Sequence, residues 1–493
     1  MVQSVILAID QGTTNSKAIL IDQQGEIVSF GSCALDISHP QSGWVEQSPY
    51  DIWSSVVSAI HSCLTSAPPH QIESIGISNQ RESIVAWDRK TGEPLAPAIT
   101  WQCRRTTEYT EKLIAAGHEG SVLAMTGLPI DPLFPASKIR WLQNRIKQKD
   151  ICTGTVDSWL IWNMTAGKRF ASDRSNASRT QLLNLNTGQW DNELCSLFDV
   201  NAETLPEVVD SNTLFGTTLN VPGLYDGIPI ASAIGDSHAA LFGHAAFSPG
   251  ESKATFGTGS SVMMLTPEFK PPLAGMTSTI AWSLDGTISY ALEGNILVSA
   301  SLFPWIADML GLDGDVDQLL DLASSVDDTN NVSVVPALTG LGAPHWVPQA
   351  RGEITGLSFA ATRSHLAHAA ALSMPLQVVD VFEAMNKQTS TKASRIYVDG
   401  GPTRNQFLMQ RLADLLAFPV YIGNVAELSA LGAGLLAGLQ SGFWDDLDAI
   451  SQLPRKRDII QPTMTSDRRD SFISQWRSAV SYCVDKQRDI LNQ

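Results

Sequence analysis

Several motifs that mark common enzyme classes are missing from this sequence. There is no G-x-x-x-x-G-K-[ST] stretch, and no G-x-G-x-x-G follows a strand pattern, so neither a P-loop nor a dinucleotide-binding fold is indicated. There is no H-E-x-x-H, and of the nine histidines only His365 and His368 are closely paired, with no cysteine near them. A transition-metal enzyme is therefore not expected.

Cysteine is scarce and scattered. The chain has six cysteines, none in a C-x-x-C pair: Cys33, Cys63, Cys103, Cys152, Cys195 and Cys483. Zinc sites and disulfide frameworks need closely or regularly spaced cysteines. This distribution therefore favours reduced, mostly buried thiols in a cytosolic protein.

Basic charge and long apolar runs are lacking as well. The net charge is −17, and no basic stripe offsets it, which argues against nucleic acid as a partner. No stretch approaches the ~20 apolar residues that a membrane helix needs. The apolar run Val5–Ile9 is too short for a secretion signal and leads directly into Asp10. We expect a cytoplasmic protein without membrane insertion.

The sequence does contain an α/β pattern of two-domain length. Its 493 residues exceed what one hydrophobic core usually supports. Strand and helix patterns alternate up to about residue 245, and a Ser48-Pro49 start followed by helical spacing predicts a helix over Pro49–Leu64. The segment Thr155–Met164 fits a strand or a helix equally well. The first half is thus predicted to be an α/β domain.

Two hairpin patterns with Gly/Thr-rich turns open the two halves. Val5–Asp22 contains two β-rich runs separated by a turn at Gly12, and Glu251–Leu265 repeats this arrangement. Successive N–H groups in such turns can hold an anion, and Asp10 could supply a carboxylate for Mg²⁺ beside it. The repetition predicts a duplicated fold, with domains 1–245 and 246–493 and a cleft between them.

The second half carries three further helical patterns. A long helix is predicted over His365–Met385 with an interruption at Pro375, and small residues over 426–440 predict a tightly packed buried helix. The charged tail from Asp446 is predicted to be a helical, solvated cover.

One acidic residue stands out at the junction of the halves. Asp236 follows an apolar strand pattern and precedes an apolar helix pattern. It could serve only as the N-cap of that helix. It could also act as the general base for a substrate hydroxyl, because a carboxylate at a strand end near a domain junction is well placed for that role.

Together, these motifs resemble the glycerol kinase branch of the FGGY carbohydrate kinases. The resemblance runs from about residue 4 to 443 and rests on the following motifs: Asp10-Gln-Gly-Thr-Thr, Gly43-Trp-Val-Glu46, Ser78-Asn-Gln-Arg-Glu82, Ile99-Thr-Trp-Gln-Cys-Arg-Arg105, Gly154-Thr-Val-Asp157, Asn176-Ala-Ser-Arg179, Gly235-Asp236, Phe256-Gly-Thr-Gly259, Tyr290-Ala-Leu-Glu-Gly294, Thr339-Gly-Leu-Gly-Ala-Pro344 and Val398-Asp-Gly-Gly401.

The resemblance implies two actin/hexokinase-like (ribonuclease H-like) ATPase domains that close over ATP and a small polyol. It assigns Asp236 as the base and Asp10 as the Mg²⁺ ligand. The implied polyol-binding residues are Arg81, Glu82 and Trp101. The implied ATP-binding residues are Thr13, Thr14, Asn15, Lys17, Thr258, Gly259, Ala300, Gly401 and Asn405. A homo-oligomer is left open.

Several positions depart from the family pattern. On the substrate side, Leu133 stands where glycerol kinases have Tyr, Ser237 where they have Gln, and Ser261 where they have an aromatic residue. Each change shortens the side chain or removes a polar group, so the pocket is predicted to be wider. The departures on the nucleotide side are Lys17 for Arg, Ala300 for Gly, Pro304 for Gln and Leu372 for Glu.

These features leave three functional hypotheses. The first is ATP-dependent phosphorylation of a terminal hydroxyl of a small polyol, with glycerol the leading substrate. The second is a kinase for a four-carbon or larger polyol or ketose, such as erythritol, erythrulose or a pentulose. The third is a catalytically idle polyol or nucleotide sensor, against which the presence of Asp10 and Asp236 argues.

Overall fold

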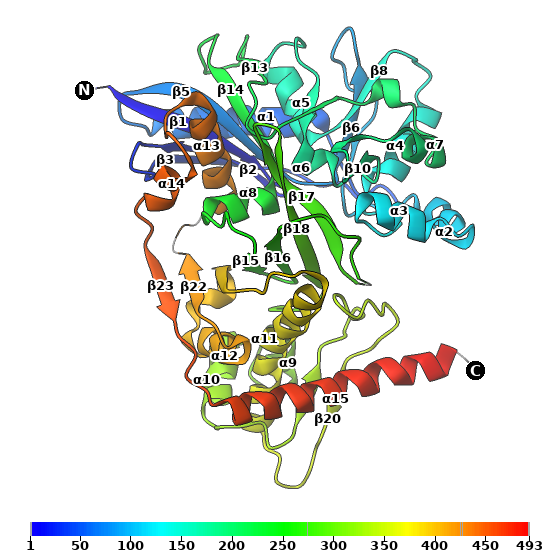
Figure 1. The fold of residues 1–493 in the computed structure, drawn as a ribbon, viewed down its shortest axis with the longest axis vertical. Helices are drawn as coiled ribbons and strands as arrows, with labels where there is room; N and C mark the ends of the chain where they lie inside the picture. Colours follow the sequence, from blue (N-terminus) through cyan, green and yellow to red (C-terminus); the bar gives the residue numbers. More distant parts are fainter. Residues whose placement is uncertain (1, 274, 424, 426, 492–493) are drawn as a thin grey trace.

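The chain forms two α/β parts stacked along its long axis (Figure 1). We describe a computed structural model over residues 2–273, 275–423, 425 and 427–491. The first half of the chain builds the upper part in this view, and most of the second half builds the lower part. Within the described ranges, no helix is long and apolar enough to span a bilayer.

The first half is built on a six-stranded sheet. Its order is β13 (Gly216–Thr217), β14 (Pro229–Gly235), β5 (His70–Asn79), β1 (Gln3–Gln11), β2 (Asn15–Ile21) and β3 (Ile27–Ala34). The hairpin β1–β2 confirms the prediction for Val5–Asp22, and its register places Asp10 opposite Lys17. Residues 5–9 of β1 are fully buried, because helices cover both faces of the sheet at this point.

The second half is built on a seven-stranded sheet. Its order is β17 (Thr277–Leu284), β18 (Thr287–Ile296), β16 (Ser260–Thr266), β15 (Glu251–Phe256), β21 (Arg395–Gly400), β22 (Val420–Gly423) and β23 (Arg457–Ile460). Strand β15 pairs antiparallel with β16 and parallel with β21, as β1 pairs with β2 and β5. The shared order of the central strands confirms that the two halves have the same basic fold.

The remaining strands form small sheets around these two. They are β4 (Glu46–Gln47), β7 (Ala98–Ile99), β6 (Ile84–Asp88) and β8 (Ile151–Thr155) in one sheet, then the pairs β10 (Leu183–Asn184) with β11 (Gln189–Trp190), β12 (Glu207–Val209) with β9 (Ala171–Asp173), and β19 (Ser333–Val335) with β20 (Glu353–Thr355).

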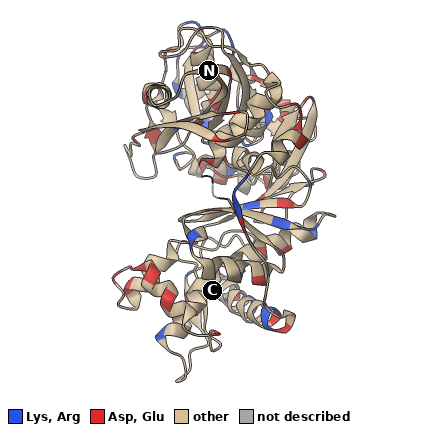
Figure 2. Cartoon of the chain, turned by 90° about the vertical axis from the view of Figure 1, so that its left-hand side faces the viewer, with Lys and Arg blue, Asp and Glu red and all other residues tan. Residues whose placement is uncertain are grey.

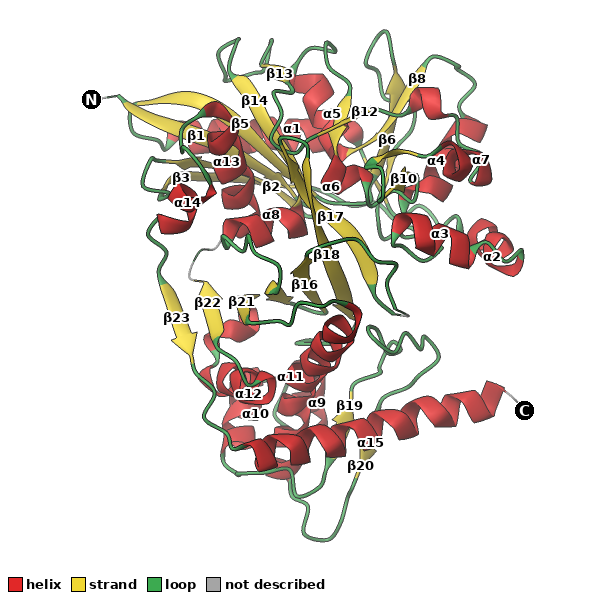
Figure 3. Ribbon diagram, viewed as in Figure 1, coloured by secondary structure: helices red, strands yellow, loops and turns green. Residues whose placement is uncertain are grey.

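Helices cover the sheets of both halves (Figure 3). In the first half they are α1 (Pro49–Thr65), α2 (Thr107–Ala115), α3 (Glu119–Thr126), α4 (Pro135–Arg145), α5 (Val156–Met164), α6 (Arg174–Ala177), α7 (Asn192–Leu197), the 3₁₀ turn η1 (Ala202–Thr204) and α8 (Asp236–Gly243). In the second half they are α9 (Leu302–Met309), α10 (Val316–Ser324), α11 (Arg363–Gln388), the 3₁₀ turn η2 (Gly401–Arg404), α12 (Gln406–Leu416), α13 (Leu428–Ser441), α14 (Leu447–Gln452) and α15 (Ser466–Leu491).

The structure settles two of the helix predictions in the first half. The helix predicted over Pro49–Leu64 is confirmed as α1, and the side chain of Ser48 caps it by accepting from the Asp51 N–H. The open alternative at Thr155–Met164 is resolved as helix α5, which is buried on nearly all sides. A helix that is buried on nearly all sides carries no periodic apolar signal, which explains the ambiguity.

The predicted interruption at Pro375 is wrong. Helix α11 is one helix from Arg363 to Gln388, with Pro375 inside it. Proline removes one i→i−4 hydrogen bond. The residues on both sides of Pro375 are buried against the core of the second half, and this packing keeps the helix in one piece.

Helix α13 comes from the second half but packs on the sheet of the first (Figure 1). It lies against β1, β5 and α8, and Gly432 permits this approach, since a Cβ there would lie 1.8 Å from the Ala239 carbonyl oxygen. The predicted buried helix over 426–440 is confirmed from Leu428 onward, and residue 426 lies outside the described residues.

The tail from Asp446 is more than a solvated cover. It contributes β23 to the edge of the second sheet, and α15 buries Phe472, Trp476 and Val480 against the core. Lys and Arg are interspersed with Asp and Glu over both halves (Figure 2). Five of the six cysteines are buried, which confirms that part of the prediction, and Cys33 is half-buried.

Candidate active site

The candidate site forms where parallel strands of the first sheet end. Register pairs Asp10 of β1 with Ser78 of β5, and Ser78 in turn with Ile234 of β14. Because carboxyl ends of neighbouring parallel strands meet at one sheet edge, the segments after them lie together. This edge brings together three of the predicted side chains: Asp10, Arg81 and Asp236.

Asp10 is a desolvated carboxylate with little cationic compensation. Its Oδ1 accepts a hydrogen bond from Ser78 Oγ at 2.8 Å. Burial and the nearby negative charge of Asp236 raise its pKa to about 6, against the lowering effects of Ser78 and Lys17. The two carboxylates are thus close enough to disfavour each other's ionisation.

Asp236 is the first residue of α8, not its N-cap. Gly235 occupies the cap position, which removes the purely structural alternative. The Asp236 Oδ1 lies 3.2 Å from Arg81 Nε and accepts from the Ser237 N–H at 2.6 Å. Its side chain is 39% exposed, so a substrate hydroxyl can reach it. Desolvation by the surrounding protein raises the pKa of Asp236, and Arg81 offsets part of that shift.

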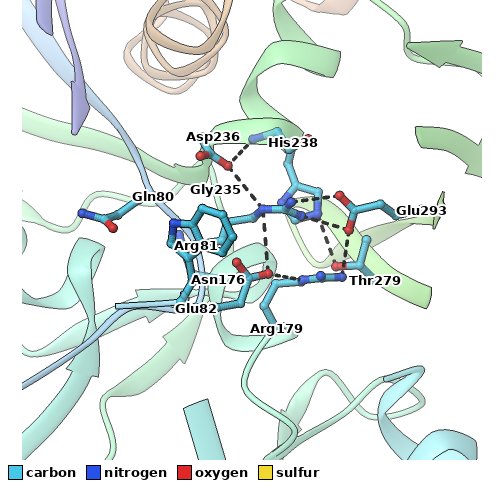
Figure 4. Close-up of polar contacts among 12 residues, drawn as sticks. Gln80, Arg81, Glu82, Asn176, Arg179, Gly235, Asp236, His238, Thr279 and Glu293 are labelled. Carbon is cyan, nitrogen blue, oxygen red and sulfur yellow. Dashed lines mark hydrogen bonds and ion pairs between the residues drawn. The ribbon is translucent and has the colours of Figure 1, made fainter. Parts of the chain in front are cut away.

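Arg81 lies between two carboxylates from different halves of the chain (Figure 4). While its Nε faces Asp236, its Nη1 and Nη2 donate to the two oxygens of Glu293 on β18, at 3.2 and 2.8 Å. Glu293 also pairs with Arg179 Nη1 at 3.1 Å, and Arg179 Nε donates to Glu82 Oε1 at 2.7 Å. The site therefore contains a continuous, buried chain of alternating charges.

The charges in this chain hold one another ionised. Burial alone would raise the pKa of Glu293, but Arg81 and Arg179 lower it well below its usual range. Burial would likewise lower the pKa of Arg81, yet Glu293, Glu82 and Asp236 raise it. The fixed ion pairs set the direction of the Arg81 side chain and thus its contact with Asp236.

Glu293 and Arg179 belong to the candidate site, and the sequence predicted no role for either of them. Both lie within motifs that carried the resemblance, Tyr290-Ala-Leu-Glu-Gly294 and Asn176-Ala-Ser-Arg179. Glu293 is also the one charged residue of strand β18 and lies in its buried part, and such an isolated charge in a buried strand was the available signal. The partners could not be identified, because they lie far away in the sequence.

The predicted substrate-side positions line this region. Ser261 Oγ donates to Glu293 Oε1 at 3.1 Å, which ties it to the ion chain. Trp101 is half-buried, and its Nε1–H donates to Thr13 Oγ1 at 3.0 Å. Leu133 and Ser237 are half-buried as well. These contacts connect the polyol side to the first hairpin turn.

The first hairpin turn holds the predicted phosphate-side residues. Thr14 and Asn15 are exposed at its tip, where Asn15 Nδ2 donates to Thr14 Oγ1 at 3.2 Å. Lys17 Nζ lies 2.7 Å from Glu427 Oε2, just before α13. Lys17 therefore has a carboxylate partner where the sequence predicted only phosphate.

The nucleotide-side residues of the second half lie at two places. The turn at Thr258 and Gly259 is joined to the segment at Ala300, since Ala300 N donates to Gly257 O and Ser299 N to Thr258 O. Gly401 is exposed directly after β21. The side chain of Asn405 caps α12 by accepting from the Leu408 N–H at 3.0 Å.

Comparison with known proteins identifies the family. Residues 5–243 match the FGGY family of carbohydrate kinases, N-terminal domain, and residues 252–441 match the C-terminal domain. The chain is 44% identical over 490 residues to an apulose kinase of Pectobacterium atrosepticum, with 98% of each chain covered. It is 42% identical over 486 residues to a glycerol kinase of Koribacter versatilis, with 97% of each covered.

Solved structures agree with this assignment. A Plasmodium falciparum glycerol kinase with ADP superposes with a TM-score of 0.93 at 32% identity, covering 98% of each chain. A Lactobacillus acidophilus xylulose kinase has the same fold, with a TM-score of 0.87 at 23% identity over 96% of each chain. The chain thus belongs to the FGGY family of carbohydrate kinases, with glycerol kinases among its relatives, and is an ATP-using kinase for a small sugar or polyol.

Proposed function

We propose that this kinase transfers the γ-phosphoryl group of ATP to a terminal hydroxyl of a polyol or ketose larger than glycerol. The observation that carries the transfer step is the placement of Asp236 beside Arg81, with its carboxylate reachable from outside. Substrate size is argued from Leu133, Ser237 and Ser261, three predicted substrate-side positions whose side chains are smaller than those of the family pattern.

Asp236 is proposed to accept the proton of the attacking hydroxyl. As the hydroxyl oxygen forms its bond to the γ-phosphorus, the bond to the β-phosphate oxygen breaks and ADP leaves. The Arg81–Asp236 contact keeps the carboxylate oriented, and Glu82 and Arg81 offer polar groups to neighbouring hydroxyls. Phosphoryl transfer depends mainly on such positioning and on charge neutralisation, so these residues supply what the reaction needs.

ATP is proposed to lie between the two Gly/Thr-rich turns. On one side are the exposed tip of the first hairpin and Lys17; on the other are the turn at Thr258, the segment at Ala300, and Gly401 with Asn405. Support comes from open backbone at Gly401, where a Cβ would meet nothing within 4 Å. We also propose that the two halves meet at a cleft that holds ATP, and that the boundary between the two domains lies at 245/246.

The residues around Asp10 fit a Mg²⁺ ion. Asp10 offers a hard oxygen ligand whose pKa is raised to about 6, first by burial and then by the negative charge of Asp236. A divalent cation there would neutralise this excess negative charge and that of the phosphates when bound. Asp10 is therefore the residue proposed to hold the metal.

The proposed substrate class rests on the side chains present at three positions. Three short side chains replace larger or more polar family residues, and Ser261 uses its hydroxyl on Glu293. The similarity to an apulose kinase supports a ketose. Glycerol is the second candidate, supported by the glycerol kinases to which the chain is 40–42% identical.

A substrate screen tests both candidates. ADP release with Mg²⁺ and ATP would be measured for glycerol, dihydroxyacetone, erythritol, erythrulose, apulose and pentuloses. A larger kcat/KM for a ketose or polyol of four or more carbons supports the proposal, while a preference for glycerol replaces it with the second candidate. If the folded protein turns over none of these substrates, both candidates are wrong and the hypothesis of a catalytically idle sensor remains.

The three pocket positions provide a directed version of this test. The combined variant Leu133→Tyr, Ser237→Gln, Ser261→Phe restores the larger side chains and should shift the kcat/KM ratio toward glycerol. If the ratio stays the same, pocket size is not what selects the substrate.

A further inference from the structure

A buried lysine beside the site has no role in the mechanism described so far. Lys138 lies in the first turns of α4, and its side chain is fully buried. Within the described part of the chain, no carboxylate forms an ion pair with its Nζ. Burying an ammonium group without a carboxylate is costly, so the contacts that it does make need an explanation.

Those contacts are two backbone carbonyl groups that belong to separate segments of the proposed substrate side. Lys138 Nζ donates to the carbonyl oxygen of Leu133 at 2.6 Å and to that of Glu82 at 3.3 Å. Side chains in a helix point back toward its N-terminus, which is why Lys138 reaches the residues just before α4. One amine thus links the loop at Leu133 to the segment after β5.

Both linked segments depend on local support. Glu82 has a φ of +60°, a left-handed conformation that is unfavourable for a residue with a side chain. The loop is fixed at Leu133 N, which donates to Asp131 Oδ1 at 2.7 Å. Lys138 supplies the bond that relates these two pieces of backbone to each other.

The number of partners matches an amine with two N–H groups. A neutral amine carries two hydrogens and here meets two carbonyl acceptors. Burial lowers the pKa of Lys138 to about 7, with Glu82, Cys103 and Asp131 opposing that shift and Arg104 adding to it. The two hydrogen bonds themselves, however, are what join the backbone at Glu82 to the backbone at Leu133.

We propose that Lys138 is a positioning residue that fixes the distance between Glu82 and Leu133 and thereby determines which carbohydrates fit the pocket. This inference rests on the proposed function, since both linked residues belong to the proposed substrate side. It goes beyond that function by assigning selectivity to a residue that does not itself contact the substrate.

The test compares Lys138→Met with a neighbouring control. Methionine keeps the length and apolar stem of lysine but cannot donate a hydrogen bond. Ser137→Ala is the matched control, because Ser137 is equally buried on α4 but shares its hydrogen bond with Thr106. The KM for the best carbohydrate of the screen, the KM for ATP and kcat are measured for each variant.

We expect Lys138→Met to raise the carbohydrate KM by about tenfold or more, the loss expected when one buried hydrogen-bond donor is removed. The KM for ATP should stay within about twofold of the wild-type value. The ratio of kcat/KM between short and long carbohydrates should move closer to one. An unchanged carbohydrate KM, or equal changes in both KM values, would overturn the proposal.

Hydrogen exchange separates this inference from the proposed function. Peptides that contain residues 80–84 and 130–134 should exchange faster in Lys138→Met without any substrate, and should be unchanged in Ser137→Ala. Normal exchange there contradicts the role of Lys138 even if a substrate is found. If methionine prevents folding, Lys138→Gln replaces it, because glutamine has two N–H donors on a shorter side chain. This variant should give smaller changes in exchange and in the carbohydrate KM, in the same direction. The absence of any such change would overturn the proposal.

Discussion

The residues of the candidate site are held by charges that compensate one another only in part. Arg81 has three acidic neighbours, Glu82, Asp236 and Glu293. Asp10, in contrast, has the carboxylate of Asp236 nearby, and the cation that acts on it, Lys17, is itself paired with Glu427. Such uncompensated carboxylates are common at functional sites, where ligand binding provides the missing positive charge. Asp10 and Asp236 should therefore respond differently when each carboxylate is replaced by an amide.

Replacing the proposed base should abolish turnover while keeping nucleotide binding. Asp236→Asn retains the shape and the contact with Ser237 N but cannot accept the hydroxyl proton. We expect kcat to fall by about 10²–10⁴-fold, the usual size of a general-base contribution. The dissociation constant of ATP, measured by calorimetry, should change little. Activity near the original level would remove Asp236 from the reaction.

Removing the charge of Asp10 should stabilise the protein at neutral and alkaline pH. The pKa of Asp10 is raised from 3.8 to about 6 in the folded protein. Its contribution to the free energy of unfolding is therefore fully present below pH 3.8 and is lost as the pH rises through 6. Asp10→Asn avoids this loss, up to about 3 kcal/mol at pH 8, and should lack activity. Urea unfolding at pH 5 and pH 8 measures the difference.

A second variant checks the cause of that effect. Ser78→Ala removes a hydrogen bond to the same carboxylate but leaves its charge. It should make the wild-type instability at pH 8 larger, by about 1 kcal/mol. If Asp10→Asn is no more stable at pH 8 than the wild type, the buried charge of Asp10 does not destabilise the protein and the explanation is wrong.

At the scale of elements, the hairpin β17–β18 connects the two halves of the molecule. It belongs to the second sheet, yet Thr279 Oγ1 contacts Ser178 Oγ at 2.9 Å and Ser283 N donates to Ser211 Oγ at 3.1 Å. Glu293 lies on the same hairpin and reaches Arg81 and Arg179. One element therefore combines a structural connection with the orientation of a site residue.

Neutralising Glu293 should affect both roles of this hairpin. Glu293→Gln leaves two buried guanidinium groups without their shared anion, so the free energy of unfolding should fall by about 3–5 kcal/mol. Arg81 would then pair more closely with Asp236 and lower its pKa, which shifts the acidic limb of the kcat profile to lower pH. Denaturant unfolding and a pH–rate profile measure the two effects.

Ser261→Ala is the matched control for Glu293→Gln. It removes only the hydroxyl that donates to Glu293 and should cost about 1 kcal/mol with no shift in the pH profile. Equal losses for the two variants would show that the charge of Glu293 is unimportant.

The elements also show what the sequence can and cannot predict. The hairpins and α1 were predictable because alternation, turn residues and a Ser-Pro cap act locally. Strand β23 lies in a charged tail and has only exposed or half-buried residues, so it has no apolar pattern and depends on pairing with β22. The same holds for the site. The roles of Asp10, Arg81 and Asp236 are implied by their motifs, whereas those of Glu293 and Lys138 depend on contacts with Arg81, Arg179 and Glu82 that the fold brings together.

At the scale of the whole molecule, sequence order and spatial order differ. The boundary expected at 245/246 assigns α13 to the second half, but this helix covers the sheet of the first. The cluster that joins them includes Ile6, Ala8, Ile234, Ala433 and Leu436, all buried. Trp444, just beyond α13, donates from Nε1 to Gln23 O at 3.1 Å and extends the contact.

A fragment experiment follows from this exchange of elements. The fragment 1–245 alone should expose the apolar face that α13 covers and should therefore lack a cooperative urea transition, because a sheet with one uncovered apolar face cannot retain its packing. Joining residues 427–445 to it through a flexible linker should restore cooperativity by supplying the missing helix and Trp444. The same linked fragment with Gly432→Val is the control, since the larger side chain cannot approach the Ala239 carbonyl. Cooperative unfolding of the bare fragment with the same midpoint as the linked one would show that α13 is dispensable, and the first half would then be an independent folding unit.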